Sequence, residues 1–105
     1  MTTIAKGKQG SWFATVARTN ENLPCLKRDY LGPRGEYHEP YFYDPSLPKN
    51  VEYVDAIKNL GRVLIATYDK SSKRTGYLEY IYLVEDVRHD ETGLRCQIVS
   101  KQKIG

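Results

Sequence analysis

Apolar and polar residues alternate with a two-residue period near the start of the chain and again in its C-terminal part. In the first of these stretches, SWFATVAR, Ala14 and Val16 fall on one face while Phe13 and Thr15 fall on the other. A two-residue period rich in aromatic and β-branched residues is typical of a β-strand. The stretch therefore predicts a strand that is buried on one face and half buried on the other.

A helical period replaces this alternation between residues 47 and 60, where apolar residues recur at three- and four-residue steps. The expected buried stripe consists of Leu47, Val51, Val54, Ile57 and Leu60. Ser46 or Asn50 can cap the start of this helix, and Gly61 suits the left-handed residue just past its end. We therefore predict one main helix at about residues 48–60, with its charged face in water.

Three strands joined by short loops are predicted after Gly61. They are RVLIATYD (residues 62–69), GYLEYIYLVEDV (residues 76–87) and LRCQIVSKQKI (residues 94–104), connected by KSSKRT and RHDETG. Short loops of this kind give an antiparallel meander. The middle strand is apolar on both faces and should be central. The last strand is expected to be an edge strand whose outer face carries Arg95, Gln97, Lys101 and Lys103.

Regular periodicity is lost between residues 19 and 47, and the five prolines of the chain lie in or just beyond this segment. Proline has no N–H for a sheet ladder, so pieces such as CLKRDYL and EYHEPYFYD could pair only along a sheet edge. The whole pattern predicts a single α+β domain over residues 1–105. Its core is a small antiparallel, partly closed sheet or barrel of four to six strands, with one helix and a long Pro/Tyr loop across one end.

The order of the helix, RVLIATYD and GYLEYIYLVEDV resembles the core of small barrels of the PUA-like superfamily, including ASCH-type and EVE-type domains. The residues that match the family pattern are Ala66, Thr67, Gly76, Tyr77, Val84 and Val87. The resemblance implies a barrel whose mouth binds nucleic acid or a modified base. It transfers no residue-level role to this chain.

Charge is unevenly distributed along the 105 residues, although the formal net charge is only +3. Residues 1–34 carry six basic and two acidic side chains, whereas residues 36–55 carry five acids and the single base Lys49. The C-terminal tail adds further bases. Such blocks predict a dipolar molecule with one basic side, and they also fit a domain whose charges only keep it soluble.

Nine tyrosines, several beside basic residues, favour a surface that binds RNA or single-stranded DNA, because such surfaces combine cations for phosphates with rings that stack on bases. The candidate binding residues are Lys27, Arg28, Tyr30, Arg34, Tyr37, Tyr41, Tyr43, Lys73, Arg74, Arg95 and Lys101.

Two alternatives stay open for the same tyrosine-rich segment. Residues 30–45 could form the interface of a protein-interaction or regulatory module, such as a small inhibitor or adaptor, because Tyr and Arg are frequent at binding hot spots. The acids Glu36, Glu39 and Asp44 favour this alternative, since they would repel phosphate on a shared surface. The tyrosines could also pack over an open end of the sheet without binding anything.

No motif predicts catalysis, a metal or a cofactor. His38 with Glu36 and Glu39, and His89 with Asp90 and Glu91, contain metal-ligating residue types, but their spacing does not enforce coordination geometry. The chain has no phosphate-binding glycine loop, dinucleotide fingerprint or His-Glu-x-x-His motif, so an enzyme has no sequence support.

The two cysteines and the hydropathy pattern bear on the location of the protein. Cys96 fits a buried strand face, and Cys25 is best interpreted as a packing thiol in a basic stretch. Two cysteines without an apolar leader favour reduced thiols in the cytoplasm. No apolar run reaches the length of a membrane span, so no membrane association is expected.

Overall fold

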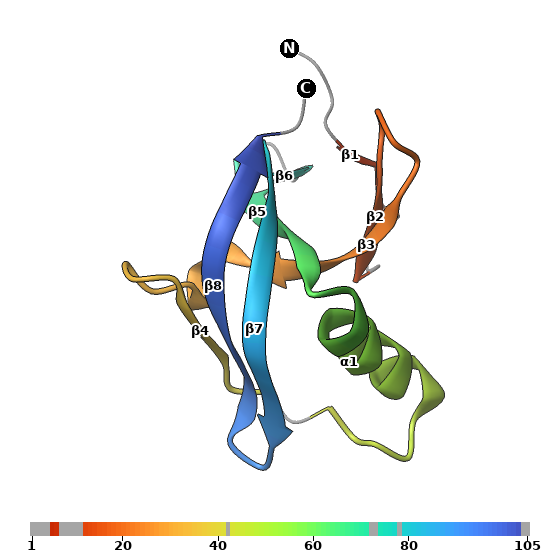
Figure 1. The fold of residues 1–105 in the computed structure, drawn as a ribbon, viewed down its shortest axis with the longest axis vertical. Helices are drawn as coiled ribbons and strands as arrows, with labels where there is room; N and C mark the ends of the chain where they lie inside the picture. The colour runs from red at the N-terminus through yellow and green to blue at the C-terminus, as the bar shows by residue number, and fades with distance from the viewer. Residues whose placement is uncertain (1–4, 7–11, 42, 72–73, 78, 104–105) are drawn as a thin grey trace.

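Eight β-strands and one α-helix make up the regular structure of the described chain (Figure 1). The computed structural model describes residues 5–6, 12–41, 43–71, 74–77 and 79–103. In chain order the elements are β1 (Ala5–Lys6), β2 (Phe13–Val16), β3 (Asn22–Lys27), the 3-10 turn η1 (Arg28–Tyr30), β4 (Glu36–Glu39), α1 (Pro48–Leu60), β5 (Arg62–Asp69), β6 (Arg74–Tyr77), β7 (Tyr80–Asp90) and β8 (Gly93–Lys103).

One mixed sheet joins these strands in the order β1-β2-β3-β5-β7-β8-β4, and β6 pairs with β5 beside that path. The β3–β5 pair is parallel, and the other strand pairs are antiparallel. The structure confirms a compact α+β fold with one helix. It corrects the expected four to six antiparallel strands to eight strands in a mixed sheet. Within the described residues the strand path is open, ending at β1 and β4, and a barrel is not observed.

Strand β4 comes from the Pro/Tyr segment and covers the first part of β8. Its register pairs Tyr37 with Cys96 and Glu39 with Leu94. The segment contributes a strand because the four residues of β4 contain no proline, while Pro40 follows immediately. The expected edge strand β8 is therefore internal over its first residues, between β7 and β4.

The C-terminal hairpin of β7 and β8 runs along the longest dimension of the molecule (Figure 1). The expected strand over residues 76–87 is divided: β6 ends at Tyr77 and returns along β5, and β7 begins at Tyr80. The connection between β7 and β8 is also tighter than the loop RHDETG suggested. It consists of Glu91 and Thr92, followed by Gly93 with a φ of 115°.

Helix α1 buries a different face from the stripe expected from the sequence. Tyr53, Val54 and Ile57 are buried against β3, β5 and β7. Three residues of the expected stripe are exposed, namely Leu47, Val51 and Leu60. The helix turns toward Tyr53 because its ring packs against Trp12 and Phe13 of the N-terminal strand region. Such packing of aromatic rings provides more buried area than a Leu or Val at the same position.

The backbone conformation of Pro48 and Gly61, and not side-chain capping, sets the two ends of α1. Pro48 occupies the first turn, and the N-cap residue Leu47 has no side-chain cap, so neither Ser46 nor Asn50 fills that role. At the other end Gly61 adopts the left-handed conformation with a φ of 63°, and its N–H donates to the Ile57 carbonyl. The glycine C-cap expected from the sequence is confirmed.

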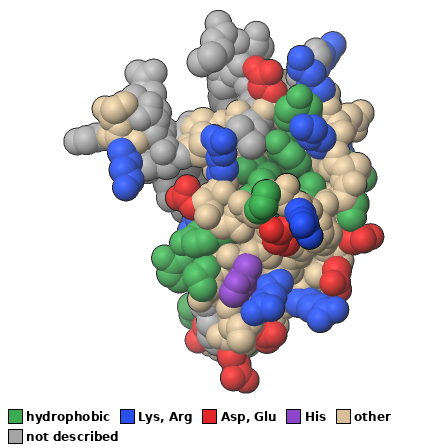
Figure 2. Space-filling model, turned by 90° about the vertical axis from the view of Figure 1, so that its left-hand side faces the viewer, with side chains coloured by type: hydrophobic (Ala, Val, Ile, Leu, Met, Phe, Trp, Pro, Cys, Tyr) green, Lys and Arg blue, Asp and Glu red, His purple; other side chains and the backbone are tan. Residues whose placement is uncertain are grey.

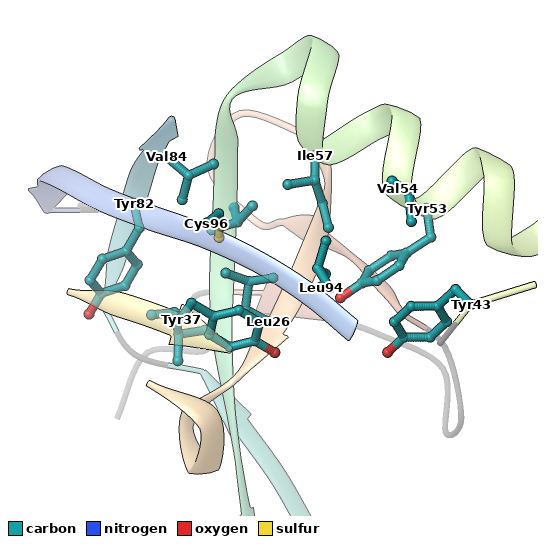
Figure 3. Close-up of a cluster of buried hydrophobic side chains, with 12 residues drawn as sticks. Leu26, Tyr37, Tyr43, Tyr53, Val54, Ile57, Tyr82, Val84, Leu94 and Cys96 are labelled. Atoms are coloured by element: carbon teal, nitrogen blue, oxygen red, sulfur yellow. The ribbon is translucent and has the colours of Figure 1, made fainter. Parts of the chain in front are cut away.

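The core consists of two clusters on opposite sides of β5. The larger lies between α1, β3, β4, β5 and the β7–β8 hairpin, and it contains Leu26, Tyr37, Tyr43, Tyr53, Val54, Ile57, Val63, Ile65, Tyr82, Val84, Leu94 and Cys96 (Figure 3). The smaller contains Ala14, Val16, Leu23, Leu64 and Ile81. Successive residues of a strand point to opposite faces, so Leu64 serves one cluster and its neighbours Val63 and Ile65 the other.

A β-bulge in β8 changes which way its basic tail points. Val84 of β7 pairs with Ile98, but the preceding residue Leu83 pairs with Ser100, so Val99 is an extra residue in β8. An extra residue inverts the alternation of all following side chains. Lys101, paired with Tyr82, therefore lies on the face that carries Ile98 and not on the face of Arg95. The expectation that Arg95 and Lys101 share one outer face is wrong for this reason.

Candidate functional site

The Pro/Tyr segment turns two of its tyrosines inward. Tyr37 is only 2% exposed and Tyr43 is 8% exposed. Figure 3 shows Tyr43 close to Tyr53 of α1 and Tyr37 close to Leu26. The rings of Tyr43 and Trp12 meet edge to face at 5.3 Å between centroids. Neither tyrosine offers a ring face to solvent, so their assignment as base-stacking residues is wrong, and for these two the packing alternative holds.

The Tyr37 hydroxyl links β3 to β4. It accepts a hydrogen bond from the Lys27 backbone N–H at 3.1 Å and donates one to the Glu39 carboxylate at 2.7 Å. Burial raises the pKa of Tyr37 far above its ordinary value, so the hydroxyl keeps its proton and can act as this donor. Lys27 at the end of β3 is thereby fixed beside the buried part of the Pro/Tyr segment.

Glu39 is fully buried, in contrast to the solvent-facing acid that the sequence suggested. Its side chain has 0% exposure, and its Oε1 accepts the hydrogen bond from Tyr37. Its Oε2 has no hydrogen-bond partner among the described residues. The other two acids of the segment remain exposed: Glu36 accepts from the Arg34 N–H, and Asp44 accepts from the Ser46 N–H. These two hydrogen bonds shape turns and do not form a common acidic surface.

Lys27, Tyr30 and Tyr41 form one group, which we call the Lys27 cluster together with the underlying Tyr37 and Glu39. The Lys27 Nζ lies 5.9 Å from the Tyr30 ring centroid and 5.2 Å from that of Tyr41. Both distances are within the range of a cation–π interaction. Tyr41 is 53% exposed, so this cluster reaches the surface.

Acidic groups lie close to the Lys27 cluster. A side-chain hydrogen bond with Tyr41 raises the pKa of Tyr30 to about 12, with smaller contributions from the negative charges of Glu39 and Asp29. These charges would oppose a phosphate group at the same place.

A second group assembles at the far end of the β7–β8 hairpin, and we call it the Tyr80 surface. Its residues are Arg28, Tyr80, Tyr82 and Lys101. The Lys101 Nζ lies 4.4 Å from the Tyr80 ring centroid, and the Tyr80 and Tyr82 rings are 6.0 Å apart. Burial raises the pKa of Tyr82, and the positive charge of Arg28 acts in the opposite direction. Figure 3 shows the Tyr82 hydroxyl at the side of the core away from α1.

The outer face of β4, β8 and β7 carries a row of basic residues. The strand registers set His38 opposite Arg95 and Arg95 opposite Arg88, so the three side chains share one face. Figure 2 shows Lys and Arg side chains grouped near a histidine on the side of the molecule that bears β4. The adjacent row is acidic, with Glu36 and Glu85 on either side of Gln97. Arg88 is also paired with Asp86 at 3.1 Å. The outer face is therefore of mixed charge.

Both histidines make hydrogen bonds that connect loops to strands. The Nε2 of His38 donates to the Thr92 carbonyl at 2.8 Å, and the Nε2 of His89 accepts from the Tyr43 N–H at 3.0 Å. No group of three or more His, Cys, Asp or Glu side chains in the described part of the chain is placed to hold a metal ion. The Glu36, His38 and Glu39 set is split by the pleat of β4, since Glu39 points inward and the other two point outward.

The cysteines are poorly suited to nucleophilic chemistry. Burial raises the pKa of the Cys25 thiol and of the Cys96 thiol to about 12 in each case. A thiol with such a pKa is almost entirely protonated at neutral pH, and the thiolate is the nucleophile.

The eleven candidate residues are thus divided among several places. Lys27, Tyr30 and Tyr41 form one cluster, and Arg28 and Lys101 belong to the Tyr80 surface. Arg95 lies on the outer face, and Arg34 sits in the turn before β4, where its carbonyl accepts from the Gln97 side chain. Lys73 and the side chain of Arg74 fall outside the described residues.

Sequence reasoning missed Tyr80 and Arg88 as surface residues and Tyr82 as the buried ring beside Tyr80. A detectable signal was the Tyr-x-Tyr of one strand followed by Lys-x-Lys in its hairpin partner, which strand pairing brings together.

No helix among the described residues has the length and apolar character needed to cross a bilayer. Comparison of the chain with protein-family models, with curated proteins and with solved structures found no match.

Proposed function

We propose that the protein binds single-stranded nucleic acid through the Tyr80 surface. The observation that carries this proposal is the position of the Lys101 ammonium 4.4 Å from the centroid of the Tyr80 ring, with the Tyr82 ring 6.0 Å from that of Tyr80. The positive charge of Arg28 acts on the Tyr82 hydroxyl. Single-strand binders combine cations that contact phosphates with aromatic rings that stack on bases. Lys103, directly opposite Tyr80 in the register, adds a third cation to this surface.

The roles of the residues follow from their burial. Tyr80 is half buried, so part of its ring can receive a base, whereas Tyr82 is buried and supports it. Lys101 is exposed, and its flexible side chain can leave the ring to contact a phosphate when a base stacks there. Arg28 would contact the neighbouring phosphate.

The test is a fluorescence-anisotropy titration of a labelled single-stranded RNA and a matched DNA at several salt concentrations. The wild-type affinity should fall log-linearly with salt, and Arg28→Ala and Lys101→Ala should each reduce the slope by about 1. Tyr80→Ala should cost about 1–3 kcal/mol with little change in the slope, since it removes stacking and not charge. Lys49→Ala, which removes an exposed lysine from α1, is the matched control. Absence of binding at low salt, or an equal effect of Lys49→Ala, would refute the proposal.

A protein-interaction role is the second candidate, and the Lys27 cluster favours it. The acids Asp29 and Glu39 stand near Tyr30, which disfavours a nucleic acid there. An exposed Tyr41 beside the Lys27 ammonium suits a protein partner. If an interface lies there, Tyr41→Ala should abolish partner binding and leave oligonucleotide binding unchanged.

A PUA-like, partly closed barrel remains a proposal for the architecture. It would require the open edges of the sheet, β1 and β4, to approach each other in solution. Long-range distance restraints between Ala5 and Tyr37 from NMR would test it, because an open sheet keeps these residues far apart.

A further inference from the structure

The Tyr30 ring of the Lys27 cluster lies nearly perpendicular to the rings of both Tyr37 and Tyr41. The Tyr30 ring makes an interplanar angle of 90° with Tyr37 and of 84° with Tyr41, at centroid distances of 6.4 and 6.0 Å. The face of an aromatic ring carries negative electrostatic potential, and faces in different planes can attract one cation together. The Lys27 ammonium is within 6 Å of two of these ring centroids.

The buried carboxylate of Glu39 adds a negative charge close to this group. Glu39 Oε1 is bonded to Tyr37, whereas Oε2 has no hydrogen-bond partner among the described residues. Because Glu39 is fully buried, a ligand does not touch this carboxylate, but the negative charge attracts a cation held at the neighbouring rings. Tyr37 connects Glu39 to this group, because its hydroxyl donates to the Glu39 carboxylate at 2.7 Å and its ring centroid lies 6.4 Å from that of Tyr30.

We propose that the Tyr30 and Tyr41 rings, with the buried negative charge of Glu39 nearby, form a binding site for an alkylammonium group, which Lys27 occupies when no ligand is present. The ligand class is a lysine-like ammonium or its methylated forms, because quaternary ammonium ions are the ligands that aromatic cages recognise. This site is separate from the Tyr80 surface, and the inference does not depend on nucleic-acid binding.

Lys27 acts as a tethered competitor in this arrangement. Its backbone N–H is held by the Tyr37 hydroxyl at 3.1 Å, so its side chain is present at the rings at a high effective concentration. A ligand must displace the Lys27 side chain before it can bind. The apparent affinity is therefore the intrinsic affinity multiplied by the fraction of molecules in which Lys27 has left the rings. Removal of the Lys27 ammonium should therefore reveal a tighter site.

The test is an NMR titration that follows the Tyr30 and Tyr41 ring resonances. Tetramethylammonium chloride is the probe, with sodium chloride at matched ionic strength as the blank. Lys27→Ala should bind the probe about tenfold more tightly than wild type, whereas Lys49→Ala should bind it like wild type. Absence of a saturable ring shift in Lys27→Ala would overturn the proposal.

Two further variants test the contributions of the Tyr41 ring and of the Glu39 charge. Adding Tyr41→Ala to Lys27→Ala should abolish saturable binding, and Tyr41 is exposed enough for this change to leave the fold intact. Adding Glu39→Gln to Lys27→Ala should weaken binding at least severalfold, with far-ultraviolet circular dichroism as the check on folding. Unchanged affinity in the Tyr41 variant, or in a folded Glu39 variant, would contradict the assignment.

The source of the ammonium group is distinguished by a second probe. N-acetyl-trimethyllysine amide carries the same headgroup as tetramethylammonium on a side chain. Tighter binding of the lysine derivative assigns the site to a side chain of a protein partner, and equal or weaker binding assigns it to a small quaternary amine. Binding of either probe supports the ammonium site, and failure of both refutes it.

Discussion

Tyr37→Phe removes one hydroxyl that serves two partners. In the folded protein this hydroxyl accepts from the Lys27 N–H at 3.1 Å and donates to the Glu39 carboxylate at 2.7 Å. The phenylalanine ring occupies nearly the same volume, so no large cavity accompanies the change. After substitution the carboxylate of Glu39, which is 0% exposed, has neither oxygen paired among the described residues.

The expected loss of stability is about 3 kcal/mol. A neutral hydrogen bond contributes about 1 kcal/mol and one to a charged group about 1.5–3 kcal/mol, and a buried group left unpaired adds its desolvation cost. Because small domains are stable by only about 5–15 kcal/mol, a loss of this size is easily measured. It corresponds to a fall in melting temperature of about 12 °C or more.

Urea denaturation of Tyr37→Phe, with Tyr41→Phe as control, measures this loss. Tyr41 is exposed, so its variant should stay within about 0.5 kcal/mol of wild type. Replacing Glu39 with Leu as well should cost less than the two single changes added together, with a coupling of about 1–2 kcal/mol, because an apolar side chain needs no donor. A Tyr37→Phe loss below about 0.5 kcal/mol, or strictly additive costs, would refute the linking role of the hydroxyl.

Two further outcomes follow from the turn after β7 and from the buried thiols. Gly93→Ala should lower the free energy of unfolding by about 2 kcal/mol or more, because residue 93 has a φ of 115° and a Cβ there would collide with the Glu39 carbonyl oxygen. Gly76→Ala, where the nearest atom is 3.4 Å away, should cost much less in the same urea titration, and equal costs would contradict this account. Folding raises the thiol pKa of Cys25 and Cys96 from 9.0 to about 12. Between these two pH values the folded state binds more protons than the unfolded state. The free energy of unfolding therefore keeps its full value below pH 9 and falls as the pH rises toward 12. The Cys25→Ala, Cys96→Ala double variant should show a shallower fall between pH 9 and 11, and an unchanged slope would contradict it.

Signals contained within a short segment of the sequence predicted the structure well. The helix at Pro48–Leu60 and the strand at Arg62–Asp69 have the expected bounds, because proline, glycine and periodicity mark their ends locally. The buried face of α1 was misjudged because hydropathy ranks Tyr53 below Leu and Val. Only the neighbouring rings of Trp12 and Tyr43 show that Tyr53 is the anchor.

Features that depend on distant residues could not be predicted in the same way. The parallel pairing of Cys25 with Leu64 joins segments with no local sign of contact. The bulge at Val99 leaves the apolar and polar pattern unchanged, yet it turns Lys101 toward Tyr80. The sequence therefore predicted which residue types form the candidate surface, but not which of those residues lie together. One extra residue in a strand decides which side chains share a face.

The pairing of β4 with β8 has a consequence for synthesis of the protein on the ribosome. Glu36 pairs with Gln97, so β4 leaves the ribosome about 60 residues before its partner has been made. At about 5–20 residues per second this interval lasts about 3–12 s. During that time Tyr37 and Glu39 lack the strand that covers them, and the nascent chain exposes an aromatic edge. Chaperones that bind such edges would act on this protein while it is being translated, and slow codons between β4 and β8 should lower its soluble yield.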